Sequence, residues 1–564
     1  MAHYLAKGKA DTLIGVNPED LARAIRAALA GSELVIGSIP EQIPLERPKN
    51  REHGDYATSI ALQLAKNAGR NPRELATALA PLIAGLPGIA KVEIAGPGFL
   101  NITLAQGAQG AIVREVLARG KDFGQGDALR GLAVNLEFIS ANPTGPLHLG
   151  HTRWAAVGDC LARILIAAGA KVTREFYIND RGTQMDLFAA SLHAAAHGLP
   201  TPENGYHGAY IQELAKQIVD ADSGIMQMTG AEAIAAFREA GYRLQLTEQK
   251  EVLDAFGTHF DVWYSEKSLH DSGAVSSVAK RLEEKGHVFH ADGATWLRTT
   301  DFGDDKDRVL VKADGELTYF TSDTAYYLDK RSRGFDLCIY LLGADHHGYV
   351  GRLKALVACA GDDPEKNIEV LIGQMVKIFE NGEEVKLSKR AGTIITLEEL
   401  VEKVGVDAAR YTLSRYPTDT SLTLDVDLLK KHTNENPVYY VQYAHARISA
   451  LLRNAQELGV SLEINDFNEK LLVHEREIEL AVAIAEFPKV VLTAAQVRGP
   501  HKVSRYLEEI AGLYHRFYND CRVLPMGEEK PSALHTSRAL LCSATRQLLA
   551  NGLDLLGVSA PERM

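Results

Sequence analysis

Two histidines three positions apart have the side chains in this sequence best suited to phosphate chemistry. His148 and His151 flank Leu149 and Gly150, at the start of a stretch whose apolar residues recur at helical spacing. The amides and the positive dipole end of a helix N-terminus attract phosphate, and Gly150 lets a ligand approach the backbone closely. Histidines at that position can stabilise charge that develops on a phosphate under attack. The alternative is an ordinary pair of surface or core histidines.

A basic segment, Lys386-Leu387-Ser388-Lys389-Arg390, is the second feature with chemical potential. Taken alone, it is typical of a solvated loop. Two lysines on such a loop could also close over a triphosphate and neutralise a pyrophosphate leaving group. The two segments together indicate nucleotide chemistry more specifically than either does alone.

The elements around these segments predict an α/β sheet. Residues 132–139 read as a strand, followed by a turn at 142–146 and then by the helix that begins at the histidines. The nearly continuous apolar run at 336–342 is typical of a strand buried on both faces, and a polar turn follows it at 343–348. Open parallel sheets bind their ligands at such turns, beyond the carboxyl ends of the strands.

The chain as a whole divides into three predicted domains. Residues 1–120 alternate helical stretches with strand-like ones, which predicts an α+β module that ends in a linker rich in glycine and charge. Residues 121–424 would form the α/β domain, interrupted by a mainly helical insertion at about 188–291. Residues 425–564 are almost wholly helical and predict a bundle. The individual helices are expected at 19–30, 57–67, 73–84, 436–458, 469–495, 502–519 and 536–556, and strands at 91–94 and 99–104.

Composition excludes several classes of protein. The 564 residues are 46% hydrophobic and 24% charged, which fits neither a disordered chain nor a fibrous repeat. No apolar run approaches the roughly 18 residues that span a bilayer, and we expect neither a membrane protein nor a secreted one. Five scattered cysteines without a C-x-x-C pair favour a reducing cytosol. The net charge of −12 argues against a nonspecific nucleic-acid coat but allows a local basic face that reads a particular RNA.

With these features in place, the chain resembles the class I aminoacyl-tRNA synthetases, whose paired signatures are written H-I-G-H and K-M-S-K-S. Leu149 and Leu387 replace Ile and Met, which conserves volume, and Arg390 replaces the final Ser while both lysines remain. Within that class the chain is similar, over nearly its full length, to the arginyl-tRNA synthetases. The supporting stretches are EFISANPTGP (137–146), YFTSDTAY (319–326), GADHHGY (343–349), VYYVQYAHAR (438–447) and SAPERM (559–564).

The resemblance implies a fold and an activity. The fold would be a Rossmann-type parallel-sheet catalytic domain with a helical insertion, an N-terminal α+β domain that touches the outer corner of tRNA, and an all-helical anticodon-binding domain. The activity would be that of an arginine–tRNA ligase, which makes arginyl-adenylate and pyrophosphate from L-arginine and ATP and then transfers arginine to the 3′ end of its tRNA. Mg²⁺ would accompany ATP. We expect a monomeric cytoplasmic enzyme whose partners are tRNA, L-arginine and ATP, with no zinc and no membrane.

Site roles follow from the same resemblance, position by position. The catalytic residues would be His148, His151, Lys386 and Lys389, and the ATP site would add Gly150, Gly343, Asp345 and Ser388. The arginine pocket would use Glu137, Asn142, Tyr319 and Asp323, since carboxylates and a phenol can grip a planar guanidinium. The tRNA-binding residues would be Tyr439, Tyr443, Arg447 and Met564. The alternatives are a strand-edge carboxylate at Glu137, a helix cap at Asp323 and core tyrosines in the bundle.

Two rival functions stay open on this basis. A small-molecule nucleotidyltransferase also uses H-x-x-H, but it needs neither the helical domain nor the lysine segment. A non-catalytic RNA-binding relative would have no chemical reason to keep both histidines and both lysines. A P-loop enzyme is excluded, because the sequence contains no G-x-x-x-x-G-K-[ST].

Overall fold

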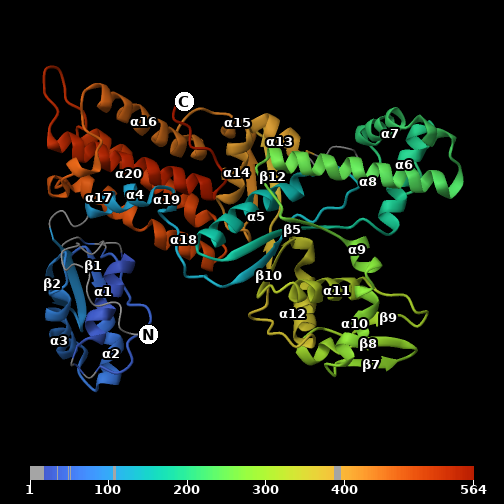
Figure 1. The fold of residues 1–564 in the computed structure, drawn as a ribbon, viewed down its shortest axis with the longest axis horizontal. Coiled ribbons are helices and arrows are strands. Elements are labelled where there is room, and N and C mark those ends of the chain that lie inside the picture. Colours follow the sequence, from blue (N-terminus) through green and yellow to red (C-terminus); the bar gives the residue numbers. More distant parts are fainter. Residues whose placement is uncertain are drawn as a thin grey trace.

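A computed structural model of the chain describes residues 18–564 except 33, 35, 49, 51, 52, 106–109 and 386–394. Lys386, Ser388 and Lys389 therefore lie outside the described residues. Figure 1 shows a small N-terminal unit, a central α/β region with two lobes, and a long array of helices above them. No helix in the described ranges is long and apolar enough to cross a membrane.

The N-terminal unit is an α+β module, as predicted. Its three-stranded antiparallel sheet has the order β1-β3-β2 and is covered by helices that bury Ile25, Ile60 and Leu79 against it. Residues 56–58 form a strand, so the helix predicted from 57 begins later than expected. The elements are α1 (Pro18–Ala30), β1 (Tyr56–Thr58), α2 (Ile60–Ala68), α3 (Pro72–Ala84), β2 (Ile89–Ala95) and β3 (Phe99–Leu104).

A five-stranded sheet forms the centre of the molecule, and all of its pairings are parallel. The strand order is β11-β10-β4-β5-β6. On β10, Ile339 and Leu341 join the core that contains α5, whereas Cys338 and Tyr340 join the core that contains α11 and α12. Both faces are thus covered, which explains the uninterrupted apolar run of that strand. The elements are β4 (Ala133–Glu137), α5 (Leu149–Ala167), β5 (Lys171–Ile178), β6 (Val262–Ser265), α11 (Tyr319–Ser332), β10 (Leu337–Gly343), α12 (Val350–Cys359) and β11 (Ile368–Gly373).

Accessory segments extend the central region. A helical insertion with its own core around Phe188 and Phe237 protrudes from one end, and a small antiparallel sheet of order β7-β8-β9 lies in the lower lobe (Figure 1). Strand β6 belongs to the main sheet although it lies within the range predicted for the insertion. The elements are α6 (Thr183–Ala196), α7 (Ala209–Ala221), α8 (Gly230–Ala255), α9 (Glu266–Asp271), α10 (Ala274–Glu283), β7 (Val288–Ala291), β8 (Ala294–Leu297) and β9 (Arg308–Val311).

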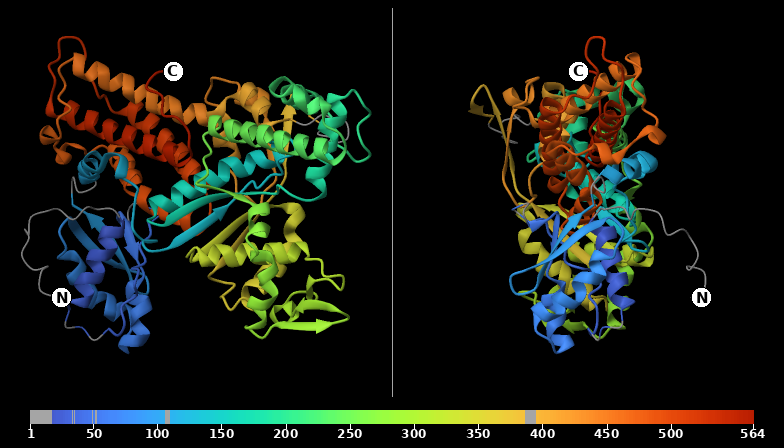
Figure 2. Two further views of the ribbon diagram at one scale, coloured as in Figure 1. Left: turned by 45° about the vertical axis from the view of Figure 1, so that its right-hand side comes forward. Right: turned by 90° about the vertical axis from the view of Figure 1, so that its left-hand side faces the viewer.

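A third small sheet links the central region to the helical array. Its strands are ordered β13-β12-β14, and its helices lead into the long helix α16. The first view of Figure 2 shows this array at the upper left, above the N-terminal unit and beside the central region. The linking elements are β12 (Val376–Glu380), β13 (Glu383–Glu384), α13 (Leu397–Val404), α14 (Val406–Ser414), β14 (Leu422–Asp425) and α15 (Val426–Leu429).

The array itself is the predicted bundle, with one added helix and one break. Helix α4, which precedes the central sheet in sequence, packs against α17 and α20. The helix predicted over 469–495 is divided: α17 ends at Ala485, and a new helix begins at Phe487 with Pro488 in its first turn, where proline is tolerated. The elements are α4 (Ala111–Arg119), α16 (Pro437–Glu457), α17 (Glu475–Ala485), α18 (Phe487–Gln496), α19 (His501–Asp520) and α20 (Ala533–Leu555).

Candidate active site

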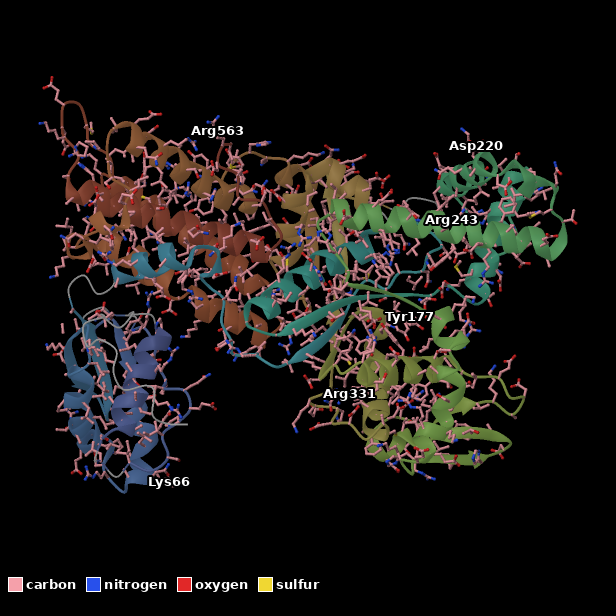
Figure 3. All side chains as sticks on the ribbon, in the orientation of Figure 1. Lys66, Tyr177, Asp220, Arg243, Arg331 and Arg563 are labelled. Atoms are coloured by element: carbon pink, nitrogen blue, oxygen red, sulfur yellow. The ribbon has the colours of Figure 1, made fainter. Side chains whose placement is uncertain are left out.

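A cavity of about 660 Å³ opens at the carboxyl edge of the central sheet. It lies between the N-terminus of α5 and the N-terminal half of α11, where the polar turns after β4 and β10 come together. Figure 3 labels Tyr177, one of its lining residues, between the sheet and the lobe that carries α11. The predicted site residues that line it are Glu137, Asn142, His148, Gly150, His151, Asp323 and Gly343.

The two histidines are fixed by the helix that they begin. His148 is the N-cap of α5 and its Nδ1 accepts a hydrogen bond from the Gly150 amide at 3.1 Å, while His151 Nδ1 accepts one from the His148 amide at 3.3 Å. The ring centroids are 4.0 Å apart. A neutral imidazole that accepts at Nδ1 carries its proton on Nε2. Both side chains are therefore set as Nε2–H donors at a helix N-terminus that lines the cavity.

Gly150 leaves the room that His148 needs. A Cβ at position 150 would lie 3.0 Å from His148 Cε1 and 3.1 Å from its Nδ1. These distances are shorter than ordinary van der Waals contact, so a larger residue would displace the imidazole. The glycine of this segment thus has a packing role beside the close ligand approach predicted for it.

The described residues that follow the lysine segment are tied to the same helix terminus. The Leu149 amide donates to Ile395 O at 3.1 Å, and the Leu397 amide donates to Leu147 O at 2.8 Å. On the other side, the Val385 amide donates to Ile378 O of β12. Residues 395–397, which directly follow this segment in the sequence, are therefore anchored beside the histidines.

Glu137 ends β4 and is held by the turn that follows it. Ile139 and Ser140 have φ values of 69° and 45°, a left-handed backbone that β-branched residues such as Ile rarely adopt. This turn brings the Ser140 hydroxyl within 3.0 Å of Glu137 Oε1, to which it donates, and the Tyr177 amide donates to the same hydroxyl at 3.1 Å. The carboxylate is only 8% exposed, and the side chain lines the cavity.

Asp323, the fifth residue of α11, faces the cavity. Burial raises the pKa of this carboxyl to about 7, with further contributions from the negative charges of Glu266 and Glu137, and Arg352 partly opposes the shift. The Tyr349 hydroxyl donates a hydrogen bond to Asp323 Oδ2. Asp323 is not the N-cap of α11, since Thr318 occupies that position. Carboxylates that repel each other in this way form a site that a cation would stabilise.

The other predicted pocket residues have different surroundings. Asn142 lines the cavity, where its Oδ1 accepts from Asn179 Nδ2 at 2.7 Å and its Nδ2 donates to Gln184 Oε1 at 2.5 Å. Tyr319 does not join the group: it is 82% exposed and is not among the residues that line the cavity. Asp345 lies on the 3₁₀ turn η6 (Ala344–Tyr349) directly after β10.

The predicted tRNA-binding residues lie on the helical array, in the C-terminal part of the sequence. Tyr439 and Tyr443 stack on one face of α16 with ring centroids 5.9 Å apart, and the Arg447 guanidinium lies 4.0 Å from the Tyr518 ring centroid. Met564 is 55% exposed and, with Tyr439, lines a second cavity of about 530 Å³. Lysines 403, 430 and 431 line that cavity too, and each of them is paired with a glutamate.

Comparisons with known proteins match all three parts of the chain. Three family profiles match, described as the arginyl tRNA synthetase N terminal domain (17–104), the class I (R) tRNA synthetase catalytic domain (112–448) and the DALR anticodon binding domain (441–564). Curated arginine–tRNA ligases of Paenarthrobacter aurescens and Frankia alni are 55% and 56% identical to this chain, over 97% of its length and 100% of each relative. The chain belongs to the arginyl-tRNA synthetase family. The fold agrees as well, because the Thermus thermophilus arginyl-tRNA synthetase superposes with a TM-score of 0.73 at 23% identity, over 97% of this chain and 100% of that one.

Family membership confirms the resemblance and the fold class inferred from the sequence. It also directs attention to residues of this synthetase that the sequence analysis missed. Tyr349 contacts Asp323, and Glu266, 8% exposed, adds its charge to the same carboxyl group. A signal for Glu266 was present, since a carboxylate that directly follows a parallel strand lies at the ligand-binding edge. The sequence pattern instead predicts that this strand belongs to the insertion.

Proposed function

We propose that the cavity at the edge of the central sheet activates L-arginine with ATP, through the residues that line it. The protein is an ATP-dependent arginine–tRNA ligase of class I. The observation that carries the site assignment is a juxtaposition: donors at the N-terminus of α5 and the carboxylates of Glu137 and Asp323 face one cavity. The donors suit a phosphate and the carboxylates suit a guanidinium, so the cavity has a place for each substrate.

The first chemical step needs positioning more than proton transfer. The arginine carboxylate attacks the α-phosphate of ATP, a P–O bond forms, and the bond to the pyrophosphate oxygen breaks. Nε2–H groups of His148 and His151, with the α5 amides, would stabilise the charge that develops on the phosphate oxygens. Gly343 and Asp345 would lie beneath the ribose of ATP. In the second step the terminal ribose hydroxyl of tRNA takes the acyl group and AMP leaves.

The pyrophosphate leaving group would be neutralised from the lysine segment. Lys386 and Lys389, with Ser388 between them, are assigned to this role by the family motif, and the anchoring of residues 395–397 beside α5 supports their reach. Mg²⁺ would come with the nucleotide, bound by its phosphates, because no group of three His, Cys, Asp or Glu side chains in the described part of the chain could hold a metal ion. No zinc is part of the proposal.

Arginine would be recognised through its charge and its planar shape. Glu137 and Asp323 can accept the rigid fork of guanidinium donors, and Asn142 can add a polar contact. Tyr319, at the start of α11, would reach the substrate only after a change of side-chain conformation, given its exposure in this structure. Lysine could not satisfy the same set of acceptors, which supports strong discrimination without an editing domain.

The remaining domains would bind tRNA. The N-terminal module would contact its outer corner, and Tyr439, Tyr443, Arg447 and Met564 would contact the anticodon region by stacking and by charge. We propose that the enzyme works as a monomer in the cytoplasm.

ATP–pyrophosphate exchange with each of the twenty amino acids tests this proposal. In the presence of tRNA for arginine, we expect exchange with L-arginine and background rates with the others. An exchange rate with L-lysine within about tenfold of the arginine rate would contradict the assigned pocket, since unpaired acceptors should cost a competitor far more than that.

A further inference from the structure

A pair of glutamates lies side by side beneath the cavity, and α11 supplies a cation to each. Glu137 on β4 and Glu175 on β5 are register partners, so both project from the same face of the sheet. Glu175 is fully buried and accepts from Arg333 at 2.6 and 2.9 Å and from the Tyr326 hydroxyl at 2.5 Å. Lys330 Nζ donates to Glu137 Oε2 at 2.5 Å.

Lys330 is unusual because it is a fully buried lysine. Its ammonium lies 4.2 Å from the ring centroid of Tyr326 and 3.9 Å from that of Tyr340, so aromatic faces cover it on two sides. Tyr340 is itself the register partner of Glu137 on the neighbouring strand β10. Such a site holds the ammonium in one place, whereas a lysine at the surface would sample many rotamers.

The two glutamates differ in how much hydrogen-bond acceptor capacity they leave for a ligand. Three donors surround Glu175, and this residue does not line the cavity. Glu137 lines the cavity, and the contacts described above, from Lys330 to Oε2 and from Ser140 to Oε1, leave acceptor capacity on a carboxylate that can take about four hydrogen bonds. The Glu137 pair thus fits a binding role and the Glu175 pair a structural one.

Helix α11 connects Lys330 with the other carboxylate of the cavity. Asp323, Tyr326 and Lys330 are spaced three and four residues apart, which places them on one face of the helix. Asp323 meets the cavity near the N-terminus of α11, and Lys330 contacts Glu137 two turns later along the helix. One helix therefore sets the positions of both acceptors relative to each other.

We propose that Lys330 is a positioning residue for arginine binding, which acts by fixing the Glu137 carboxylate and supplying its counter-charge. Without it, Glu137 would be a buried carboxylate beside Glu175, and like charges at register positions repel. Glu137 would then turn away from the orientation that receives a guanidinium. This inference rests on the proposed role of Glu137 in arginine binding.

Variants of the two ion pairs separate a positioning role from a merely structural one. We expect Lys330→Met to raise the KM for arginine by at least about tenfold, the scale of one charged hydrogen bond, with the KM for ATP within about twofold of the original. Arg333→Met, at the C-cap of the same helix, is the matched control: it should lower the melting temperature but leave the KM for arginine near its starting value. The full-length enzyme, assayed by exchange with tRNA present, serves for all variants.

A double-mutant cycle with Glu137→Gln completes the test. If Lys330 acts through Glu137, then E137Q and E137Q/K330M should have the same KM for arginine within about twofold, because the second change removes nothing further. This comparison holds even if K330M alone proves too unstable to assay. Additive effects in the cycle, or equal rises in the KM for arginine in K330M and R333M, would overturn the proposal. An unchanged KM for arginine in E137Q would instead refute the proposed binding role of Glu137 itself.

Discussion

The histidines of the cavity have a structural role in α5 beside the chemical role that we propose for them. His148 and His151 satisfy backbone amides of α5 through Nδ1, and this contact sets the proton on Nε2. A substitution by alanine would remove the cap and the donor together. The two roles can be separated, because asparagine is one of the best N-cap residues.

For the chemical role, we expect His148→Ala and His151→Ala each to lower the rate of adenylate formation by roughly 10²- to 10³-fold, the scale of one lost transition-state donor. Substrate binding should change much less. His148→Asn should keep the melting temperature near the original while the rate still falls. Rapid-quench measurement of arginyl-adenylate checks this, and an unchanged rate in both alanine variants would refute the assigned role.

Asp323 gives the cavity a pH dependence. Its carboxyl group has a pKa of about 7 in the folded protein, raised chiefly by burial, against an ordinary value of about 3.9. Arginine needs the anion as its partner, so the KM for arginine should fall as pH rises from about 6 to 8. In Asp323→Asn that pH dependence should disappear and the KM should be higher by at least about 10²-fold. Exchange kinetics across this pH range decide the matter.

The stability of the fold should fall over the pH range in which arginine binding improves. Between the two pKa values the folded state keeps a proton that the unfolded chain has lost, so the stability that comes from protonated Asp323 is lost as pH rises through about 7. Asp323→Asn should therefore raise the melting temperature relative to the parent protein more at about pH 8 than at about pH 5. An equal shift of the melting temperature at both pH values would mean that folding does not raise the pKa of the Asp323 carboxyl group.

The placement of α5 is the main packing requirement at the scale of elements. Gly158, in the middle of this helix, lies against the Phe138 ring, and a Cβ there would be 2.3 Å from its Cδ2. Phe138 directly follows Glu137, so this contact couples the helix of the histidines to the strand of the carboxylate. Any residue larger than glycine must push the two apart.

We expect Gly158→Ala to destabilise the fold by about 1 to 3 kcal/mol through overpacking and to lower kcat as well. Gly351→Ala is the control: it is also a helical glycine, in α12, with no atom within 4 Å of an added Cβ. That change should be neutral or stabilise by about 0.5 to 1 kcal/mol, the ordinary gain of alanine over glycine in a helix. Chemical denaturation of both variants measures the difference, and equal losses would contradict the packing argument.

Much of this element framework could be predicted from the sequence. Periodicity and the strand–turn–helix order located β4, α5 and β10, because long buried elements have strong local patterns. The short strand β6 falls within the range predicted for the insertion, because four residues between helices are too few to show a strand periodicity. Contacts such as those of Lys330 with Glu137 and of Tyr349 with Asp323 join distant segments, and no local pattern indicates them.

A buried guanidinium connects the parts of the whole molecule. Arg410 of α14 donates to Asp159 of α5 at 2.6 Å and to Leu556 O, just after α20, at 3.2 Å, and all of these groups are buried. It also donates to Phe256 O at 3.0 Å, at the end of α8. The helical array and the helix that begins at His148 therefore share one polar centre.

Because the helical array and the central region are connected, we expect little ATP–pyrophosphate exchange without tRNA. RNA bound to the helical array would have to bias the conformation of the cavity through contacts such as those of Arg410. The exchange rate with arginine and ATP should rise many-fold when tRNA for arginine is added, and should fall with salt because phosphate contacts release counterions. Full exchange with arginine and ATP alone would refute the coupling but not the enzyme assignment.

The central claim is that carboxylates in this cavity select the guanidinium of arginine. The most direct test compares L-arginine with L-citrulline, which has nearly the same shape but a neutral urea group, as the ratio of their kcat/KM values in exchange with tRNA present. We predict a ratio of at least about 10³ for the parent enzyme, since two buried acceptors lose charged partners, and a ratio at least about tenfold smaller for Asp323→Asn. A parent ratio near one, or a variant that loses both substrates equally, would contradict the account.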